Sequence, residues 1–273
     1  MKKNTITNPN RRRGVLAAIA TVALAVACTG IGFAYSFLRD LWHEQCVIAD
    51  LATQVRINDG RMVRADVITR EFGLRNGANL ALIDFAEKRR ATLKKIPNLR
   101  NIVVRRRLPD GLEIEIEERS ACVRVGVKGS RTSSNRVADS EGVVFSCALA
   151  STGLLPVIRE PASQTTRIGN VLGTRSLAAL RLIEICGEKF TDLGVREADV
   201  SNSDYILLTL GDYSRAKVAW EGMDNPSPSN TANLIKQLRH LSQAIASRVG
   251  AGVRVWNATQ DGHIFADTQK GFL

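Results

Sequence analysis

LKKIPNLRNIVVRRRLPDGLEIEIEER, residues 93–119, predicts two β-strands joined by a tight turn. The turn is expected at Pro109-Asp110-Gly111, because proline fixes φ at about −65°, aspartate can bond its own backbone two residues on, and glycine accepts positive φ. After the turn, apolar residues alternate with glutamates over residues 112–117, which is the period of a strand with one buried face. The segment therefore predicts a β-hairpin whose second strand is acidic on its exposed face.

Three consecutive arginines, Arg105, Arg106 and Arg107, end the first strand of this hairpin. In strand geometry Arg105 and Arg107 face opposite Arg106, so we expect at least one exposed face and a basic patch. Two interpretations of the patch stay open. It either contributes to partner binding or has a structural role in cross-strand pairs with Glu115 and Glu117.

The N-terminal segment predicts a membrane span. Residues 14–38 contain no charged residue and lie between Arg13 and Arg39. At about 1.5 Å per helical residue the run is about 37 Å long, enough for a hydrocarbon core of about 30 Å. Residues 1–13 carry five Lys/Arg and no acidic residue, so positive-inside bias places them in the cytoplasm and residues 39–273 across the membrane. Residues 39–50 are then a juxtamembrane linker.

A cleaved signal is the alternative to an anchor. Ala25-Val26-Ala27 ends in a small-x-small pattern, and with Cys28 it loosely matches a lipoprotein cleavage site. The apolar stretch continues to residue 38, well past Cys28, which a span requires and a cleaved signal does not. We therefore interpret residues 14–38 as an uncleaved single transmembrane helix.

Composition argues against a nucleic-acid partner in spite of a formal net charge of +11. The charge is divided between the N-terminal tail and a mixed surface over residues 51–119, and aromatic residues make up only 5% of the chain. Basic patches interleaved with stacking platforms are therefore missing. A polybasic tail beside a span instead predicts contact with anionic lipid head groups, worth about 1 kcal/mol per residue.

No motif for catalysis, a cofactor or a metal is present. The sequence lacks a GxSxG elbow, a P-loop, an HExxH motif and a CxxC pair, and its three histidines are far apart. We expect no enzymatic activity, no catalytic residue, no cofactor and no metal. Cys122 and Cys147 flank two strands expected at residues 122–127 and 142–146, so both a disulfide and unpaired buried thiols stay open.

Past residue 120 the pattern predicts a β-rich domain with two helices. Leu234, Leu238, Leu241 and Ile245 form one apolar stripe of the second helix, which is expected to start after an N-cap at Ser229 or Asn230 because Pro226 and Pro228 break structure. The other expected elements are a hairpin at 136–145, a strand at 155–158, a helix at 175–186, strands at 205–210 and 216–220, and two last strands at 253–256 and 263–266 around Asp261-Gly262.

The order of these motifs resembles the FtsQ/DivIB family of bacterial cell-division proteins, whose first exported domain is a polypeptide-transport-associated (POTRA) domain. The motifs that carry the resemblance are the opening strand and turn at residues 55–59, the G-x-N-L connection at 77–80, residues 93–97, the Arg-Leu-Pro-Asp turn at 107–110, the Ile-Glu-Glu-Arg end at 116–119, and the later elements at 137–145 and 155–158. Two departures are visible. Ser120-Ala121-Cys122 stands where the family has an acidic residue and proline, and Val253–Asn257 is a weak match to the family's penultimate strand.

The resemblance implies an α+β fold with a single N-terminal transmembrane helix, a POTRA domain at 51–119, a C-terminal β domain at 120–268 and a tail at 269–273. It implies a bitopic inner-membrane scaffold of the divisome, with most of the chain periplasmic and located at the septum. A POTRA-bearing export or outer-membrane assembly component is the alternative. Such proteins follow their POTRA domains with a barrel of spans, and residues 120–273 show no such series.

The resemblance also implies partners of the FtsB and FtsL type at the last strands, with other divisome proteins at the POTRA domain as a second option that would include Arg105, Arg106 and Arg107. A terminal strand is expected to be a sheet edge that accepts an added strand. The large side chains Trp256 and Phe265 either bind the partner or fill the core. The candidate positions are Val253, Val255, Trp256, His263, Ile264 and Phe265.

Overall fold

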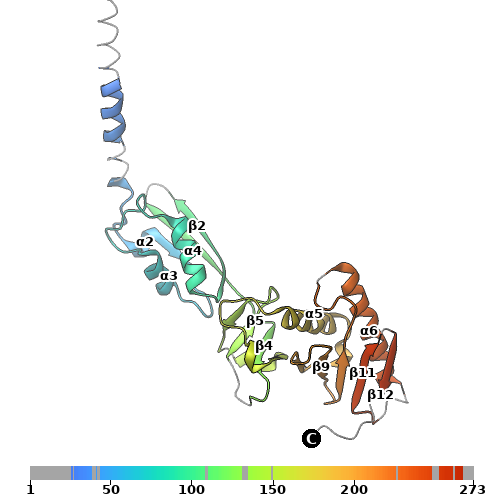
Figure 1. The fold of residues 1–273 in the computed structure, drawn as a ribbon. Helices are drawn as coiled ribbons and strands as arrows, with labels where there is room; N and C mark the ends of the chain where they lie inside the picture. The colour runs from blue at the N-terminus through green and yellow to red at the C-terminus, as the bar shows by residue number, and fades with distance from the viewer. Residues whose placement is uncertain are drawn as a thin grey trace, which may run out of the picture. The chain divides into compact units, whose positions relative to one another are not determined.

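The computed structural model describes residues 26, 28–38, 41, 44–107, 110–130, 135–148, 150–225, 227–247, 252–260 and 262–266. Over these residues the chain is an α+β protein with a three-stranded and a nine-stranded sheet (Figure 1). It divides into two compact units. The first comprises Met1–Asn58, Asp66–Lys88 and Val103–Glu115, and the second comprises Asp59–Ala65, Arg89–Ile102 and Ile116–Leu273.

Residues 28–38 are helical, and most of their large apolar side chains are exposed, including those of Phe33, Tyr35 and Phe37. The other residues of the span predicted at 14–38, Val26 apart, lie outside the described part of the chain, as does Trp42. Among the described residues, no helix combines the length and the apolar character needed to cross a membrane. The anchor at residues 14–38 therefore stays a prediction.

The three-stranded sheet contains the predicted hairpin. Its order is β1, β3, β2, with β1 parallel to β3. In β3 the leucine and isoleucines at 112, 114 and 116 are buried, while the glutamates between them lie on the other face, which confirms the predicted alternation. The turn residues 108 and 109 lie outside the described part. The strands are β1 (Val55–Ile57), β2 (Leu99–Arg107) and β3 (Gly111–Glu118).

Three helices accompany this sheet: α2 (Leu51–Gln54), α3 (Ala65–Phe72) and α4 (Phe85–Lys95). α3 buries Ile68 and Phe72, which are four residues apart and so lie on one helix face. The start of α4 is set by Asp84, whose carboxylate accepts hydrogen bonds from the backbone N–H groups of Ala86 and Glu87, both at 2.9 Å. An aspartate in this position satisfies donors that have no partner within the helix.

The nine-stranded sheet is mixed and runs in the order β12, β11, β10, β9, β8, β7, β4, β5, β6. The β4–β7, β7–β8 and β10–β11 pairs are parallel, and the other pairs are antiparallel. The strands are β4 (Val123–Val127), β5 (Arg136–Ala138), β6 (Val144–Ser146), β7 (Val157–Glu160), β8 (Glu197–Asp199), β9 (Ile206–Thr209), β10 (Arg215–Val218), β11 (Val255–Gln260) and β12 (His263–Ala266).

Helices α5 (Thr174–Lys189) and α6 (Pro228–Ala246) pack on one face of this sheet and contact each other (Figure 1). A single apolar core joins the buried residues of both helices to those of the strands. The predicted stripe of α6 is confirmed, because Leu234, Leu238 and Leu241 are buried and Ile245 packs against the same core.

The predicted N-cap of α6 is wrong. The helix starts at Pro228, and the hydroxyl of Ser227 accepts a hydrogen bond from the N–H of Asn230 at 3.1 Å. Proline is tolerated in the first helical turn, because its missing N–H would have no intrahelical partner there. Pro228 therefore begins the helix instead of breaking it, which excludes Ser229 and Asn230 as caps.

Cys122 and Cys147 do not form a disulfide, since both are free thiols. β5 separates β4 from β6, so the two strands that these cysteines flank are not neighbours. Cys147 is buried with Val137 and Phe145, whereas Cys122 packs against the large core under the helices. The interpretation of these residues as unpaired thiols is the one that the structure shows.

Candidate functional site

β12 is an edge of the nine-stranded sheet. It pairs antiparallel with β11 on one side, and no other described strand pairs with it on the other. An edge strand presents unpaired backbone N–H and C=O groups that can bind an added strand. The predicted position of the last strand at an edge is therefore what the structure shows.

The direction of each backbone group in β12 follows from the neighbouring pairings. The carbonyl of Ala258 in β11 accepts a hydrogen bond from Ala219 at 3.2 Å, so the backbone groups of Ala258 point toward β10. Directions alternate along a strand, so Asn257 points toward β12, where it lies opposite Phe265. The backbone N–H and C=O of Phe265 therefore point toward β11, and those of the adjacent Ile264 point away from it, to the open edge.

The side chains of β12 alternate between the two faces. Ile264 is half-buried and packs against the core under the helices, whereas His263 and Phe265 are exposed on the other face. The two exposed rings stack with their centroids 6.1 Å apart. Phe265 is 49% exposed, so this edge offers an aromatic surface beside the open backbone groups.

Trp256 and Phe265 separate the two interpretations that the sequence left open. Trp256 is only 5% exposed and belongs to the core, so it is a packing residue. Val253 and Val255 are half-buried, and Val253 also packs against the core. Of the six residues predicted at this site, the three in β12 form the open edge, and the three on or before β11 support it.

The arginines of the predicted basic patch have partners in their own domain. Arg105 forms an ion pair with Glu115, and Arg107 forms one with Glu113 at 2.8 Å. The guanidinium of Arg106 lies on the other face of β2, 4.8 Å from the ring centroid of Phe85. The opposite facing of these side chains is therefore confirmed. All three remain solvent-exposed.

The expected pair with Glu117 is wrong, because Glu117 pairs with Arg100 at 3.3 Å. The antiparallel register brings the residues closest to the turn together, so Arg107 meets Glu113. Cross-strand pairing favours the structural interpretation of Arg105 and Arg107, and exposed pairs of this kind contribute about 0.2–1 kcal/mol each.

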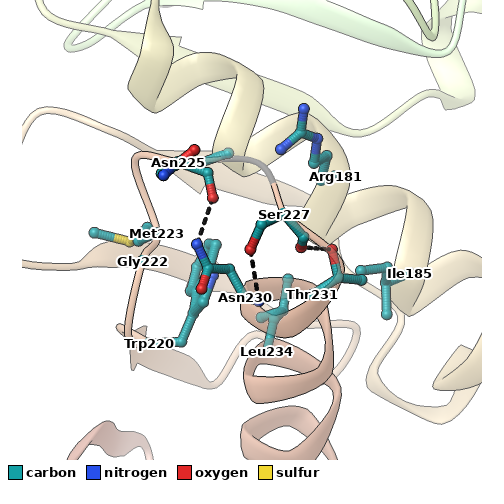
Figure 2. A pocket seen from close by; sticks show the side chains of 11 residues that line it. Arg181, Ile185, Trp220, Gly222, Met223, Asn225, Ser227, Asn230, Thr231 and Leu234 are labelled. Atoms are coloured by element: carbon teal, nitrogen blue, oxygen red, sulfur yellow. Dashed lines mark hydrogen bonds between the residues drawn. The ribbon is translucent and has the colours of Figure 1, made fainter.

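Two hollows lie in the second unit. A small cavity of about 10 Å³ lies beside the first turn of α6, where the Asn230 amide donates to the carbonyl of Asn225 at 2.7 Å (Figure 2). It has room for about one water molecule. A larger apolar cleft of about 360 Å³ is lined by Cys122 and Cys186 among others. Burial raises the pKa of Cys186 to about 12, so its thiol stays protonated and is a poor nucleophile at neutral pH.

The sequence interpretation missed Gln237, a polar residue of α6 that touches the β11 backbone. Its side-chain amide donates to the carbonyls of Ala258 at 2.8 Å and Gln260 at 3.0 Å. The signal was present, since Gln237 lies three residues after Leu234 and so falls on the apolar stripe. A polar residue at a core position needs hydrogen-bond partners.

The three-stranded sheet with its helices, which spans residues 51–118, forms a POTRA domain. Residues 52–119 match the family model described as POTRA domain, FtsQ-type. This match supports an FtsQ/DivIB-like protein and suggests a role in cell division. No curated protein matches the chain.

Proposed function

We propose that this protein is a bitopic scaffold of the bacterial cell-division machinery, without enzymatic activity. Residues 14–38 anchor it in the inner membrane with residues 1–13 in the cytoplasm. The POTRA domain (51–119) and the β domain (120–268) lie in the periplasm, bind other division proteins and link septal wall synthesis to the division site. One observation carries the proposal: an FtsQ-type POTRA domain is followed by a sheet that ends in an open edge.

The partner of this edge is a small bitopic division protein of the FtsB or FtsL type, which adds a strand beside β12. Backbone pairing supplies affinity in this mode, and alternate side chains supply specificity. Ile264 directs its N–H and C=O outward, and the stacked rings of His263 and Phe265 flank that backbone on the exposed face. Arg105, Arg106 and Arg107 are the second candidate surface, for other divisome proteins.

The decisive experiment replaces Ile264 with proline in the full-length protein. Proline is tolerated on an edge strand whose N–H faces solvent, so Ile264→Pro should remain folded by circular dichroism. The variant no longer offers the N–H of residue 264, so one carbonyl of the partner's added strand is left unpaired. This costs about 1–3 kcal/mol, or about 5- to 150-fold in affinity. The measurement is the affinity of the detergent-solubilised protein for the FtsB-type protein of the same genome.

Two variants make the result specific. Ile264→Ala removes the same side chain but keeps the N–H, so it should bind more tightly than Ile264→Pro. Phe265→Pro removes a donor that β11 uses, so it should destabilise the sheet itself. A folded Ile264→Pro protein that binds its partner as well as Ile264→Ala would place the interface elsewhere.

A further inference from the structure

Gln237 is buried between α6 and β11, at 2% exposure. Its Nε2 donates to two backbone carbonyls of β11, those of Ala258 and Gln260. Its Oε1 is also buried and has no hydrogen-bond partner within the described residues. An apolar side chain would fill this core position without burying an unpaired amide oxygen, but it would not donate to the two carbonyls. The amide is therefore explained by what it does to β11, and not by packing.

The two carbonyls lie in an irregular part of β11. That of Ala258 also accepts a hydrogen bond from the N–H of Ala219 on the β10 side, so Gln237 adds a second bond there and a further one to Gln260. Asn257 lies opposite Phe265, but Gln260 lies opposite His263, so β11 advances three residues while β12 advances two. One extra residue in one strand is a β-bulge, which disrupts the ladder locally and leaves backbone groups unpaired. Bulges next to binding edges re-aim the strand and end its pairing.

Side chains form hydrogen bonds to the backbone of this bulge from both faces of the sheet. The carboxamide oxygen of Asn257 accepts a hydrogen bond from the N–H of Thr259 at 3.1 Å and one from its hydroxyl at 2.8 Å. Gln237 reaches the carbonyls from the helix-covered face, where Ala258 is fully buried. The bulge is thus held by one side chain on each face.

We propose that Gln237 is a positioning residue for the β12 edge, acting with Asn257. By holding the bulge it fixes the register of β12, and so decides that Ile264 points its backbone groups outward and its side chain inward. A slip of one residue would move each side chain of the strand to the other face. The inference rests on the proposed function, because it assigns Gln237 to the same strand-binding site.

The test compares Gln237→Met with Leu238→Met in the full-length protein. Methionine keeps the approximate volume of glutamine but cannot donate, and Leu238→Met changes a fully buried neighbour that does not bond to β11. Hydrogen exchange is measured by mass spectrometry in peptides covering 255–266 and 144–160. With two hydrogen bonds lost, Gln237→Met should exchange about tenfold faster in 255–266 only, and it should bind the FtsB-type protein more weakly. Leu238→Met should neither speed exchange in 255–266 selectively nor weaken binding of the FtsB-type protein selectively.

A second pair of variants separates the bulge from general packing. Asn257→Ala removes the acceptor for Thr259 and should act like Gln237→Met, whereas Asn257→Asp keeps an acceptor and should restore slow exchange and binding. Unchanged exchange in 255–266 of Gln237→Met would overturn the inference, and so would faster exchange with unchanged partner affinity. If the wild-type protein does not bind the FtsB-type protein, the proposed function fails, while the exchange comparison still decides whether Gln237 holds the bulge.

Discussion

Replacing Asp139 with asparagine should be among the most damaging single-atom changes in the second unit. Asp139 forms an ion pair with Arg119, and the two side chains are only 6% and 14% exposed. The other carboxylate oxygen of Asp139 accepts hydrogen bonds from the N–H groups of Glu141 at 3.1 Å and Val143 at 2.8 Å. The residue thus holds the turn between β5 and β6 and neutralises a buried guanidinium at the same time.

The size of the effect follows from which bonds survive. Asparagine keeps the oxygen that faces Glu141 and Val143, but it presents an NH₂ group to the guanidinium of Arg119. Removing one partner of a buried ion pair costs about 3–5 kcal/mol. Arg119 keeps a contact with Glu141 at 3.0 Å, and Glu141 is half-exposed. We therefore expect a loss of about 2–4 kcal/mol in the free energy of unfolding.

Urea unfolding followed by circular dichroism measures this loss, with Arg100→Gln as the matched control. Arg100 pairs at the surface with Glu141 at 2.8 Å and with Glu117 at 3.3 Å, and breaking an exposed pair costs about 0–1 kcal/mol. The double variant Arg119→Met with Asp139→Asn should be less destabilised than the sum of the single variants, because it leaves no buried charge. If Asp139→Asn costs no more than Arg100→Gln, the burial argument is refuted.

Two further predictions concern acid stability and glycine geometry. Hydrogen bonds from Arg119 and Arg100 hold the pKa of Glu141 below its ordinary value of 4.5. The ionised carboxylate therefore stabilises the fold fully above that value, and this stabilisation is lost as the pH falls through the lowered pKa of the folded state. In thermal unfolding, the melting temperature of Glu141→Gln should fall less on acidification than that of the wild type, and an equal fall would contradict this. Gly222 has φ +73° and a Cβ there would lie 2.1 Å from the Asn230 side chain, so Gly222→Ala should lose about 1–3 kcal/mol in urea unfolding. Gly187 lies within α5, and an added Cβ there meets no atom, so Gly187→Ala should gain about 0.5–1 kcal/mol in the free energy of unfolding. A loss for Gly187→Ala would show that the cost at Gly222 does not come from its positive φ and close contact.

The hairpin of β2 and β3 could be predicted from sequence because each of its signals is local. Turn chemistry at residues 109–111 and the alternation at 112–117 lie within a few residues of each other, and both act before any long-range contact forms. The same holds for the stripe of α6. The N-cap at Ser227 is also local, but the sequence does not reveal it, because proline can either break a helix or begin one, and Pro228 begins α6.

The order of the nine strands could not be predicted, since it depends on pairings between distant segments. β8 has three residues, of which only Ala198 is fully buried, so it shows no hydrophobic period. β11 was expected to end at Trp256 but continues to Gln260, because the polar residues after Trp256 belong to a bulge that side chains stabilise. The sequence also could not decide whether Trp256 or Phe265 is exposed, because that depends on which face of the sheet α5 and α6 cover.

The distribution of protection among the sheet edges supports β12 as the strand-binding site. At the opposite edge of the nine-stranded sheet, Val144 of β6 exchanges backbone hydrogen bonds with the loop at 169–170, at 2.9 and 2.7 Å, so that edge is covered. The β2 edge of the smaller sheet carries arginines, and charged side chains oppose unwanted strand pairing. β12 reads His-Ile-Phe-Ala, with no Lys, Arg, Asp or Glu, and among the described residues no strand pairs with its free side. An unprotected edge is an aggregation hazard, and a partner strand that covers it would explain why the chain keeps it.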